Sequence, residues 1–260
     1  MILDDIVAYK KNEVDLQKQR VPLQQLKDAA FFHQPTLGFL QTLRGWNGRT
    51  IIAEVKKASP SKGIIRADFD PLSLAKTYEE NGAAAISVLT ESKFFQGSLA
   101  YLQLIRENVS RPLLRKDFLF DPYQVYEARS FGASAILLIV AILSDSQLRE
   151  LAALAQSLTL DCLIEVHDAD ELERALNCGV QLLGINNRDL RTFHTTSEIT
   201  ERLIGQVPQG VLVISESGLS RSEQLTRLEA QGVKGFLIGE TFMAAADPGI
   251  PLRTLLQGDP

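Results

Sequence analysis

The sequence predicts an α/β protein of the (β/α)8 class: a closed TIM barrel of parallel strands alternating with helices, preceded by an N-terminal helical extension. Three observations predict this fold. Eight short apolar runs recur at intervals of about 26 residues, the length of one strand, one helix and two short loops. The runs are almost continuously apolar, as in strands covered on both faces. Helix-start and helix-end signals lie between the runs.

The eight runs are the expected strands. In chain order they are Ile51–Val55, Ala84–Leu89, Pro112–Leu114, Ala135–Val140, Cys162–Val166, Leu182–Ile185, Val211–Ile214 and Gly235–Ile238. Residues 1–46 carry apolar side chains at helical spacing, including Ile2, Ile6 and Tyr9, and are expected to cover one end of the barrel. No linker rich in Pro, Gly or Ser divides the chain, so residues 1–260 are expected to form a single barrel domain. An open doubly wound sheet is the alternative, but it usually has fewer strands, and no GxGxxG motif follows the first run.

The expected helix boundaries come from capping residues. Asp70-Pro71 and Asp121-Pro122 read as an N-cap followed by proline at the first helical position. Capping-box or similar spacing is found at three further places, namely Ser144/Gln147, Asp168/Glu171 and Ser220/Glu223. Glycines suited to helix C-termini precede four of the strands, namely Gly82, Gly132, Gly179 and Gly232.

Composition narrows the class of protein. The 260 residues have 45% hydrophobic and 23% charged side chains, which excludes disorder, and a net charge of −5, which gives no reason to expect nucleic acid or an anionic membrane as partner. The longest apolar run, Ala135–Leu143, is too short to span a bilayer, and the N-terminus does not resemble a secretory signal. Cys162 and Cys178 form no CxxC pair, so we expect reduced thiols in a cytoplasmic protein; the scattered histidines predict no metal site.

Charged and amide side chains inside or directly after the apolar strands are the main functional signal. They are Glu54, Lys56, Lys116, Glu165, Asn186 and Glu216. Each comes near the carboxyl end of its strand, where barrels of this type place their active sites. A salt bridge closing the barrel mouth would explain any one of them, but six polar groups on one rim favour a catalytic site.

Two glycine-bearing loops indicate a phosphate site. Ser217-Gly218 follows the seventh strand, and Gly239-Glu240 follows the eighth strand, where a short helix begins. Glycine lets backbone N–H groups approach an anion, and a helix N-terminus favours negative charge.

The remaining candidates lie in the other loops. Ser59 belongs to a polar loop after the first strand, which is either a lid over the substrate or an ordinary surface loop. Phe94, Phe95 and Phe118 would either line a flat pocket for an aromatic ring or belong to the core. Arg188 would contact an anion or pair with Asp189, and His167 is expected in a loop or behind the catalytic groups.

With these residues the chain resembles the indole-3-glycerol phosphate synthase family. The matching motifs are Ile52–Gly63, Leu114–Phe118, Leu137–Ala141, Ile164–His167, Gly184–Leu190, Ile214–Gly218 and Leu237–Gly239, and the start of the chain, Ile2–Val14, is also similar. The resemblance covers nearly the whole chain in motif order. It is looser at Thr195–Ser197, where the family more often has a Val-Asp-Leu-like stretch.

The resemblance implies a lyase of tryptophan biosynthesis that is also a decarboxylase. Its substrate would be 1-(2-carboxyphenylamino)-1-deoxyribulose 5-phosphate, a phosphosugar joined to anthranilate, and ring closure would release carbon dioxide and water. No cofactor or metal is implied, and a monomer or weak homo-oligomer is expected.

The resemblance also implies the roles of the residues. Lys116 would be the principal general acid, Glu165 the partner acid or base, and Lys56 a group that binds the substrate's anionic groups and assists dehydration. Glu54, Asn186 and Glu216 would orient these groups and the sugar hydroxyls. Two lysines close together in a desolvated site are expected to have lowered pKa values.

Three alternatives stay open. A phosphoribosylanthranilate isomerase would need a Cys and an Asp at strands one and six, where this chain has Glu54/Lys56 and Asn186. A Schiff-base aldolase would use Lys116 or Lys56 as nucleophile. A non-catalytic sensor of phosphorylated ligands would not need all six polar groups.

Overall fold

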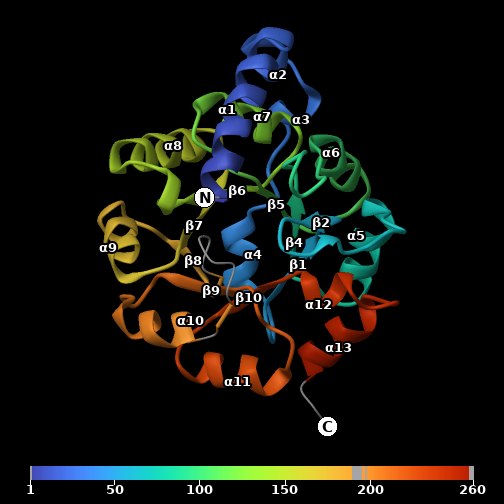
Figure 1. The fold of residues 1–260 in the computed structure, drawn as a ribbon, viewed down its shortest axis with the longest axis vertical. Coiled ribbons are helices and arrows are strands. Elements are labelled where there is room, and N and C mark those ends of the chain that lie inside the picture. Colours follow the sequence, from blue (N-terminus) through green and yellow to red (C-terminus); the bar gives the residue numbers. More distant parts are fainter. Residues whose placement is uncertain (1, 189–194, 197, 258–260) are drawn as a thin grey trace.

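The computed structural model describes residues 2–188, 195–196 and 198–257, and its central feature is a closed barrel of eight parallel strands (Figure 1). The barrel strands are β1 (Ile51–Val55), β4 (Ala85–Leu89), β5 (Leu113–Lys116), β6 (Ala135–Ile139), β7 (Asp161–Val166), β8 (Leu182–Asn186), β9 (Leu212–Glu216) and β10 (Gly235–Ile238). Each strand pairs with its neighbours in chain order, and β10 pairs with β1 to close the ring. The predicted TIM barrel is confirmed. Each barrel strand begins and ends within two residues of its predicted apolar run. Strands β5, β8 and β9 extend beyond their runs into the polar residues that follow.

Helices surround the barrel (Figure 1). They are α5 (Pro71–Glu80), α6 (Leu99–Asn108), α7 (Pro122–Ser130), α8 (Asp145–Ser157), α9 (Ala169–Asn177), α10 (Glu198–Leu203), α11 (Ser222–Ala230), α12 (Glu240–Met243) and α13 (Gly249–Gln257), with 3-10 turns η1 (Val140–Ile142) and η2 (Ile204–Gln206). After β1, the short strands β2 (Ala58–Ser59) and β3 (Gly63–Ile64) form a separate antiparallel hairpin. No helix among the described residues is long and apolar enough to cross a membrane.

Most of the capping signals are confirmed. The side chains of Asp70, Asp121, Ser144 and Asp168 accept hydrogen bonds from the first turns of α5, α7, α8 and α9. The four helix-terminal glycines all have positive φ, as the left-handed end of a helix requires. The predicted capping box at Ser220 is wrong: α11 begins at Ser222, with Arg221 as its N-cap and no side-chain cap.

The N-terminal extension was expected to cover one end of the barrel, but it contacts both ends. Its helices are α1 (Ile2–Arg20), α2 (Leu23–Lys27), α3 (Ala30–His33) and α4 (Phe39–Gly45). Phe39 and Leu43 of α4 pack with residues at the amino ends of the strands, and the Leu40 N–H donates to Asp161 at the start of β7. Helix α1 instead reaches the carboxyl end, where Lys10 meets Asp117.

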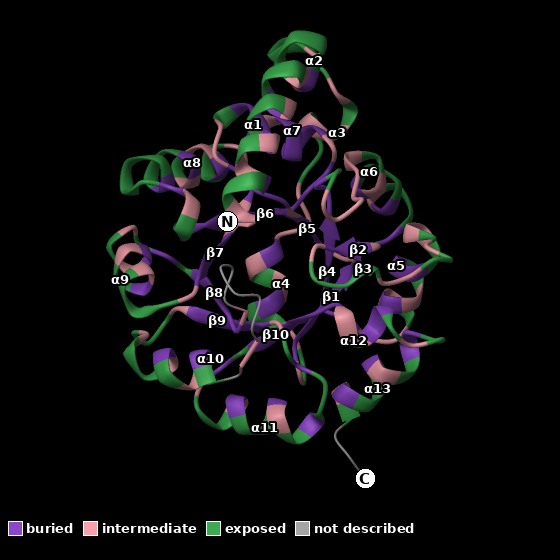
Figure 2. Ribbon diagram, in the orientation of Figure 1, coloured by how far each residue is buried: buried purple, intermediate pink, exposed green. Residues whose placement is uncertain are grey.

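Side-chain alternation along the strands creates two apolar layers. The barrel strands between these layers are buried (Figure 2). One layer, which includes Ile51 and Leu113, lies between the strands and the surrounding helices. The other, which includes Ile52 and Leu114, fills the barrel interior. Because side chains two positions apart share a face, the interior register carries the polar residues at the strand ends into the barrel mouth.

Candidate active site

A cavity of about 570 Å³ opens at the carboxyl end of the barrel, where the polar strand ends converge. All six residues expected to be catalytic line it: Glu54, Lys56, Lys116, Glu165, Asn186 and Glu216. So do seven of the eight expected binding residues: Ser59, Phe118, Arg188, Ser217, Gly218, Gly239 and Glu240. The six catalytic candidates therefore meet in one cavity from the ends of five strands, namely β1, β5, β7, β8 and β9.

Lys116 lies between two buried carboxylates at the centre of this cavity. Its Nζ is 2.9 Å from Oε2 of Glu165 and 3.2 Å from Oε2 of Glu216. An ammonium has three protons to donate, so two can serve the carboxylates while the third stays free for a substrate atom. The other oxygen of Glu216, Oε1, is buried without a hydrogen-bond partner among the described residues.

The pKa of Lys116 is raised, which contradicts the lowered value expected from the sequence. Burial lowers this pKa, but the charges of Glu165, Glu216 and Glu54 outweigh burial. The acids around Lys116 come from other strands, and their effect on its pKa exceeds that of burial. Lys116 is therefore an ammonium at neutral pH.

The two carboxylates beside Lys116 differ in acidity. Burial acts to raise the pKa of Glu165, but Lys116 and His167 lower it below its usual range. Burial raises the pKa of Glu216 to about 8, because the attraction of Lys116 does not fully offset burial and the repulsion from Glu165 and Glu54. The two acids are coupled through Lys116, and Glu165 is the more acidic of the pair.

Two glycines make room for the acidic side chains. A Cβ on Gly184 would come within 2.2 Å of Glu216 Oε1, and a Cβ on Gly239 within 2.4 Å of Glu54 Oε1. Glu54 is also paired with Lys56, whose Nζ is 2.5 Å from Glu54 Oε1. Gly239 thus belongs to the expected phosphate loop and also contacts Glu54, an expected catalytic residue, so its substitution would disturb both.

An apolar wall forms the side of the cavity near β4, β5 and β6. It includes Leu89, Phe95, Phe118, Leu137 and Ile139. The rings of Phe95 and Phe118 have centroids 6.1 Å apart. Phe94 lies outside the cavity lining and packs edge-on against Tyr9 of α1. Nothing in the sequence distinguishes Phe94 from Phe95. Their side chains differ in direction because of a turn in which Glu91 accepts hydrogen bonds from the backbone N–H groups of both residues.

The opposite side of the cavity is formed by loops. Ser217 and Gly218 both have positive φ, of 65° and 71°, which turns the backbone sharply after β9. Arg188 reaches across from β8, donates to Ser61 Oγ and pairs with Glu240 at 3.1 Å. Its other expected partner, Asp189, lies outside the described residues.

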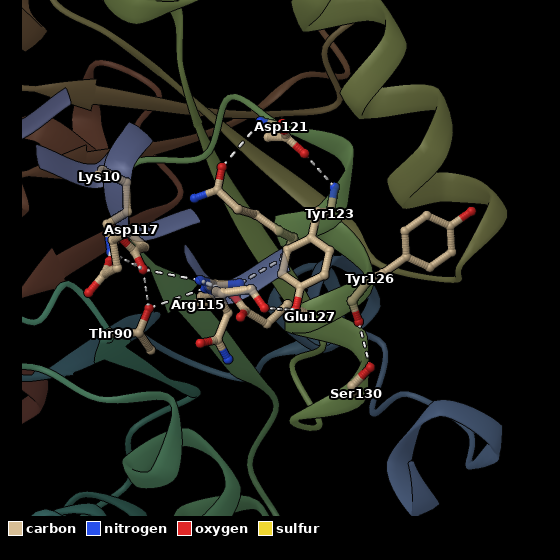
Figure 3. A network of polar contacts seen from close by, with 12 residues as sticks. Lys10, Thr90, Arg115, Asp117, Asp121, Tyr123, Tyr126, Glu127 and Ser130 are labelled. Atoms are coloured by element: carbon tan, nitrogen blue, oxygen red, sulfur yellow. Dashed lines mark hydrogen bonds and ion pairs between the residues drawn. The ribbon is translucent and has the colours of Figure 1, made fainter. Parts of the chain in front are cut away.

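Buried charges behind β5 hold the strand that carries Lys116 (Figure 3). The side chains of Arg115 and Asp117 leave the strand on the face opposite Lys116. Arg115 pairs with Asp117 at 3.2 Å and with Glu127 of α7 at 2.8 Å. Lys10 of α1 pairs with Asp117 at 3.0 Å. Burial acts to raise the pKa of Asp117, but Lys10 and Arg115 lower it to about 2.

Replacing Arg115 with Met is expected to destabilise the protein by about 3–5 kcal/mol, because Glu127 would stay buried without its cation. Denaturant unfolding followed by circular dichroism measures this free energy. Lys18→Met is the matched control, because it removes a cation from a partly exposed pair with Asp121 and should cost at most about 1 kcal/mol. Equal losses in the two variants would contradict the structural role of Arg115.

His167, which was not expected among the site residues, lies beside the candidate catalytic residue Glu165. Its Nε2 is 3.3 Å from Glu165 Oε1, and its side chain is 11% exposed. Its position two residues after Glu165 was the available signal, since both side chains then lie on the same side of the chain. No group of three or more His, Cys, Asp or Glu in the described part of the chain is arranged to hold a metal ion.

A lysine between carboxylates, in a cavity at the carboxyl end of a (β/α)8 barrel, defines an enzyme that acts by proton transfer. A family model described as indole-3-glycerol phosphate synthase matches residues 3–255. The chain belongs to the indole-3-glycerol phosphate synthase family, whose members are carboxy-lyases of tryptophan biosynthesis.

Relatives of known name align with this chain over almost their whole length. Proteins named indole-3-glycerol phosphate synthase from Acidithiobacillus ferrooxidans and Acetivibrio thermocellus are 48% and 50% identical to this chain. The first match covers 98% of each protein, and the second covers 94% of this chain and 95% of the relative. Among solved structures, a mutant tryptophan synthase α-subunit from Pyrococcus furiosus superimposes with a TM-score of 0.62 at 14% identity, covering 82% of this chain and 99% of that one. The structural match supports the fold alone.

Proposed function

We propose that the cavity binds 1-(2-carboxyphenylamino)-1-deoxyribulose 5-phosphate, and that Lys116 and Glu165 carry out the proton transfers of its ring closure. Membership of the family assigns the reaction to the chain: the indole ring forms with loss of carbon dioxide and water. The observation that supports the residue roles is the Lys116 ammonium held between Glu165 and Glu216 inside the cavity.

In the first step, carbon–carbon bond formation at the sugar carbonyl leaves negative charge on the carbonyl oxygen. The free proton of the Lys116 ammonium neutralises that oxygen, and loss of carbon dioxide restores the aromatic ring. Departure of the resulting hydroxyl as water needs a second proton to the leaving oxygen and removal of one proton from the substrate. Glu165 is ionised and is the base for that removal.

The other cavity residues position the substrate. Of the three expected phenylalanines, Phe95 and Phe118 but not Phe94 provide an apolar wall for the anthranilate ring. Lys56, held by Glu54, lies where it can bind the substrate carboxylate and assist dehydration. The polar side chains of Asn186 and Glu216 orient the sugar hydroxyls. Ser59 lies in the hairpin over the cavity.

The loops after β9 and β10 are the proposed site of the phosphate. Backbone N–H groups around Ser217, Gly218, Gly239 and Glu240 would receive its oxygens, and Arg188 supplies a nearby cation. The negative charge of Glu240 is already paired with Arg188, so this residue contributes through its backbone.

Two alternative activities are less favourable. A Schiff-base aldolase needs an unprotonated amine, whereas the acids around Lys116 hold it as an ammonium. A sensor of phosphorylated ligands has no use for a buried lysine between two acids. An indole-fluorescence assay with the proposed substrate tests the function directly. Product formation supports the proposal, and its absence with folded protein would refute it.

Replacing Gly218 with Ala is expected to weaken the binding of substrate and of inorganic phosphate more than it lowers kcat. Gly218 has φ 71°, and a Cβ there would come within 2.5 Å of Thr195, so the loop must shift. Gly179→Ala is the matched control, since Gly179 has φ 74° and lies before β8, at the other end of the barrel. Competition by phosphate that is unchanged in Gly218→Ala would remove the phosphate site from this loop.

A further inference from the structure

Glu165 and Glu216 contact Lys116 in nearly the same way, yet a single lysine can neutralise only one of them. Both carboxylates are about 1% exposed, and their distances to Nζ are 2.9 and 3.2 Å. Two ionised acids in one buried space repel each other, so the pair holds one proton near neutral pH. Which acid holds this proton decides which one can act as the base.

The surroundings of the two acids differ in one respect, the imidazole of His167. Its Nε2 lies 3.3 Å from Oε1 of Glu165, the oxygen that Lys116 does not contact. The corresponding free oxygen of Glu216 has no hydrogen-bond partner among the described residues. Glu165 therefore has two nitrogen neighbours and Glu216 has one.

Both nitrogens of His167 face carboxylates. Nδ1 is 3.0 Å from Oε2 of Glu171, and Nε2 is near Glu165. A neutral imidazole would point one lone pair at an acid, whereas an imidazolium places its charge beside both acids. Nδ1 is hydrogen-bonded to Glu171, while Nε2 approaches Glu165 at ion-pair distance without forming a hydrogen bond. Burial acts to lower the pKa of His167, but its contacts with Glu165 and Glu171 raise it to about 10.

Glu171 is itself fixed by the first turn of α9. Its carboxylate accepts the backbone N–H of His167 at 2.8 Å, and its own N–H donates to the N-cap Asp168. A carboxylate in the first turn is also stabilised by the helix dipole. The imidazole is thus oriented from α9 while its other nitrogen faces Glu165.

The charged groups around this cluster come from five elements. Glu54 and Lys56 come from β1 and its end, Lys116 from β5, Glu165 from β7 and Glu216 from β9. Glu171 on α9 faces His167 from the other side. Lys116 contacts both Glu165 and Glu216. Among these groups, His167 is the one that contacts Glu165 and not Glu216.

We propose that His167 is a positioning residue that keeps Glu165 ionised and so assigns the shared proton to Glu216. The inference rests on the proposed function, because it divides the base and acid roles between two carboxylates of that site. Lys116 can then replace a donated proton by taking one from Glu216, which lies 3.2 Å away.

The protonation state can be measured without substrate. Nitrogen-15 NMR of the unmodified protein at pH 7.5 should show His167 with both ring nitrogens protonated, and Glu171→Gln should lower the pH at which it titrates. A neutral His167 in the unmodified protein would overturn the proposal while leaving the proposed function intact. An imidazolium signal in a protein that makes no indole product would instead refute the proposed function and retain the charge assignment.

Turnover gives the second measurement. In His167→Gln the acid limb of the kcat–pH profile should move up by about one pH unit, because Glu165 loses a cation and is protonated more readily. A merely structural role would lower kcat equally at every pH and lower Tm. His33→Gln, on the exposed α3, is the matched control and should leave the profile unchanged. An acid limb that does not move in folded His167→Gln would overturn the proposal.

Discussion

Replacing Lys116 with Arg is expected to lower kcat by about 10²–10⁴-fold, the contribution of a general acid, with little change in substrate affinity. The guanidinium keeps a positive charge between Glu165 and Glu216, so binding and folding are retained. Its planar fork holds its protons too tightly to deliver one to the substrate. Steady-state kinetics and a binding titration on the same preparation measure the two quantities separately.

The control for this prediction is Lys234→Arg, an exposed position just before β10 and at the other end of the barrel. That variant should retain wild-type kinetics. Borohydride added to the wild-type enzyme with substrate should trap no adduct, because a general acid never bonds to the substrate. A substrate-dependent adduct on Lys116 would change the assignment to Schiff-base chemistry. Wild-type turnover in Lys116→Arg would transfer the acid role to Lys56.

The barrel could be predicted because its signals are local. Each strand is a short apolar run, and a proline or an N-cap marks the start of helices such as α5 and α7. The start of α11 could not be located in this way, since Ser220 and Glu223 have capping-box spacing but Arg221 takes the N-cap position. The placement of α4 depends on contacts with residues more than 40 positions away, such as Ala84, and no local pattern reports them.

The convergence of the charged side chains in one cavity could be predicted because charge is costly inside a strand and strand alternation fixes the direction of each side chain. The sign of the Lys116 pKa shift could not, because it depends on three acids from three other strands. The distances between side chains on different strands are set by the closure of the barrel, and no local sequence pattern predicts these distances. For the same reason the pairing of Arg188 with Glu240, 52 residues later, was not foreseen.

Replacing Glu165 with Gln is expected to lower kcat by about 10²–10⁴-fold, the range for a lost acid–base group, while Tm stays near that of the wild type. The amide keeps the shape and hydrogen-bonding size of the carboxylate but cannot accept a proton. Stability is retained because removal of the Glu165 charge lowers the pKa of Glu216, which then ionises and pairs with Lys116. Kinetics and thermal unfolding of one preparation check both statements.

Glu216→Gln is the matched comparison, since it makes the same substitution beside the same lysine. A protonated carboxyl and an amide are nearly isosteric, and both are neutral donors, so this variant already resembles the state that the raised pKa assigns to Glu216. Its kcat should fall by about tenfold, because the amide keeps the hydrogen bonding but cannot return a proton to Lys116, while Glu165 stays available as the base. A loss in Glu216→Gln as large as that in Glu165→Gln would mean that the two acids share the proton equally. The asymmetry that His167 introduces would then have no part in the reaction.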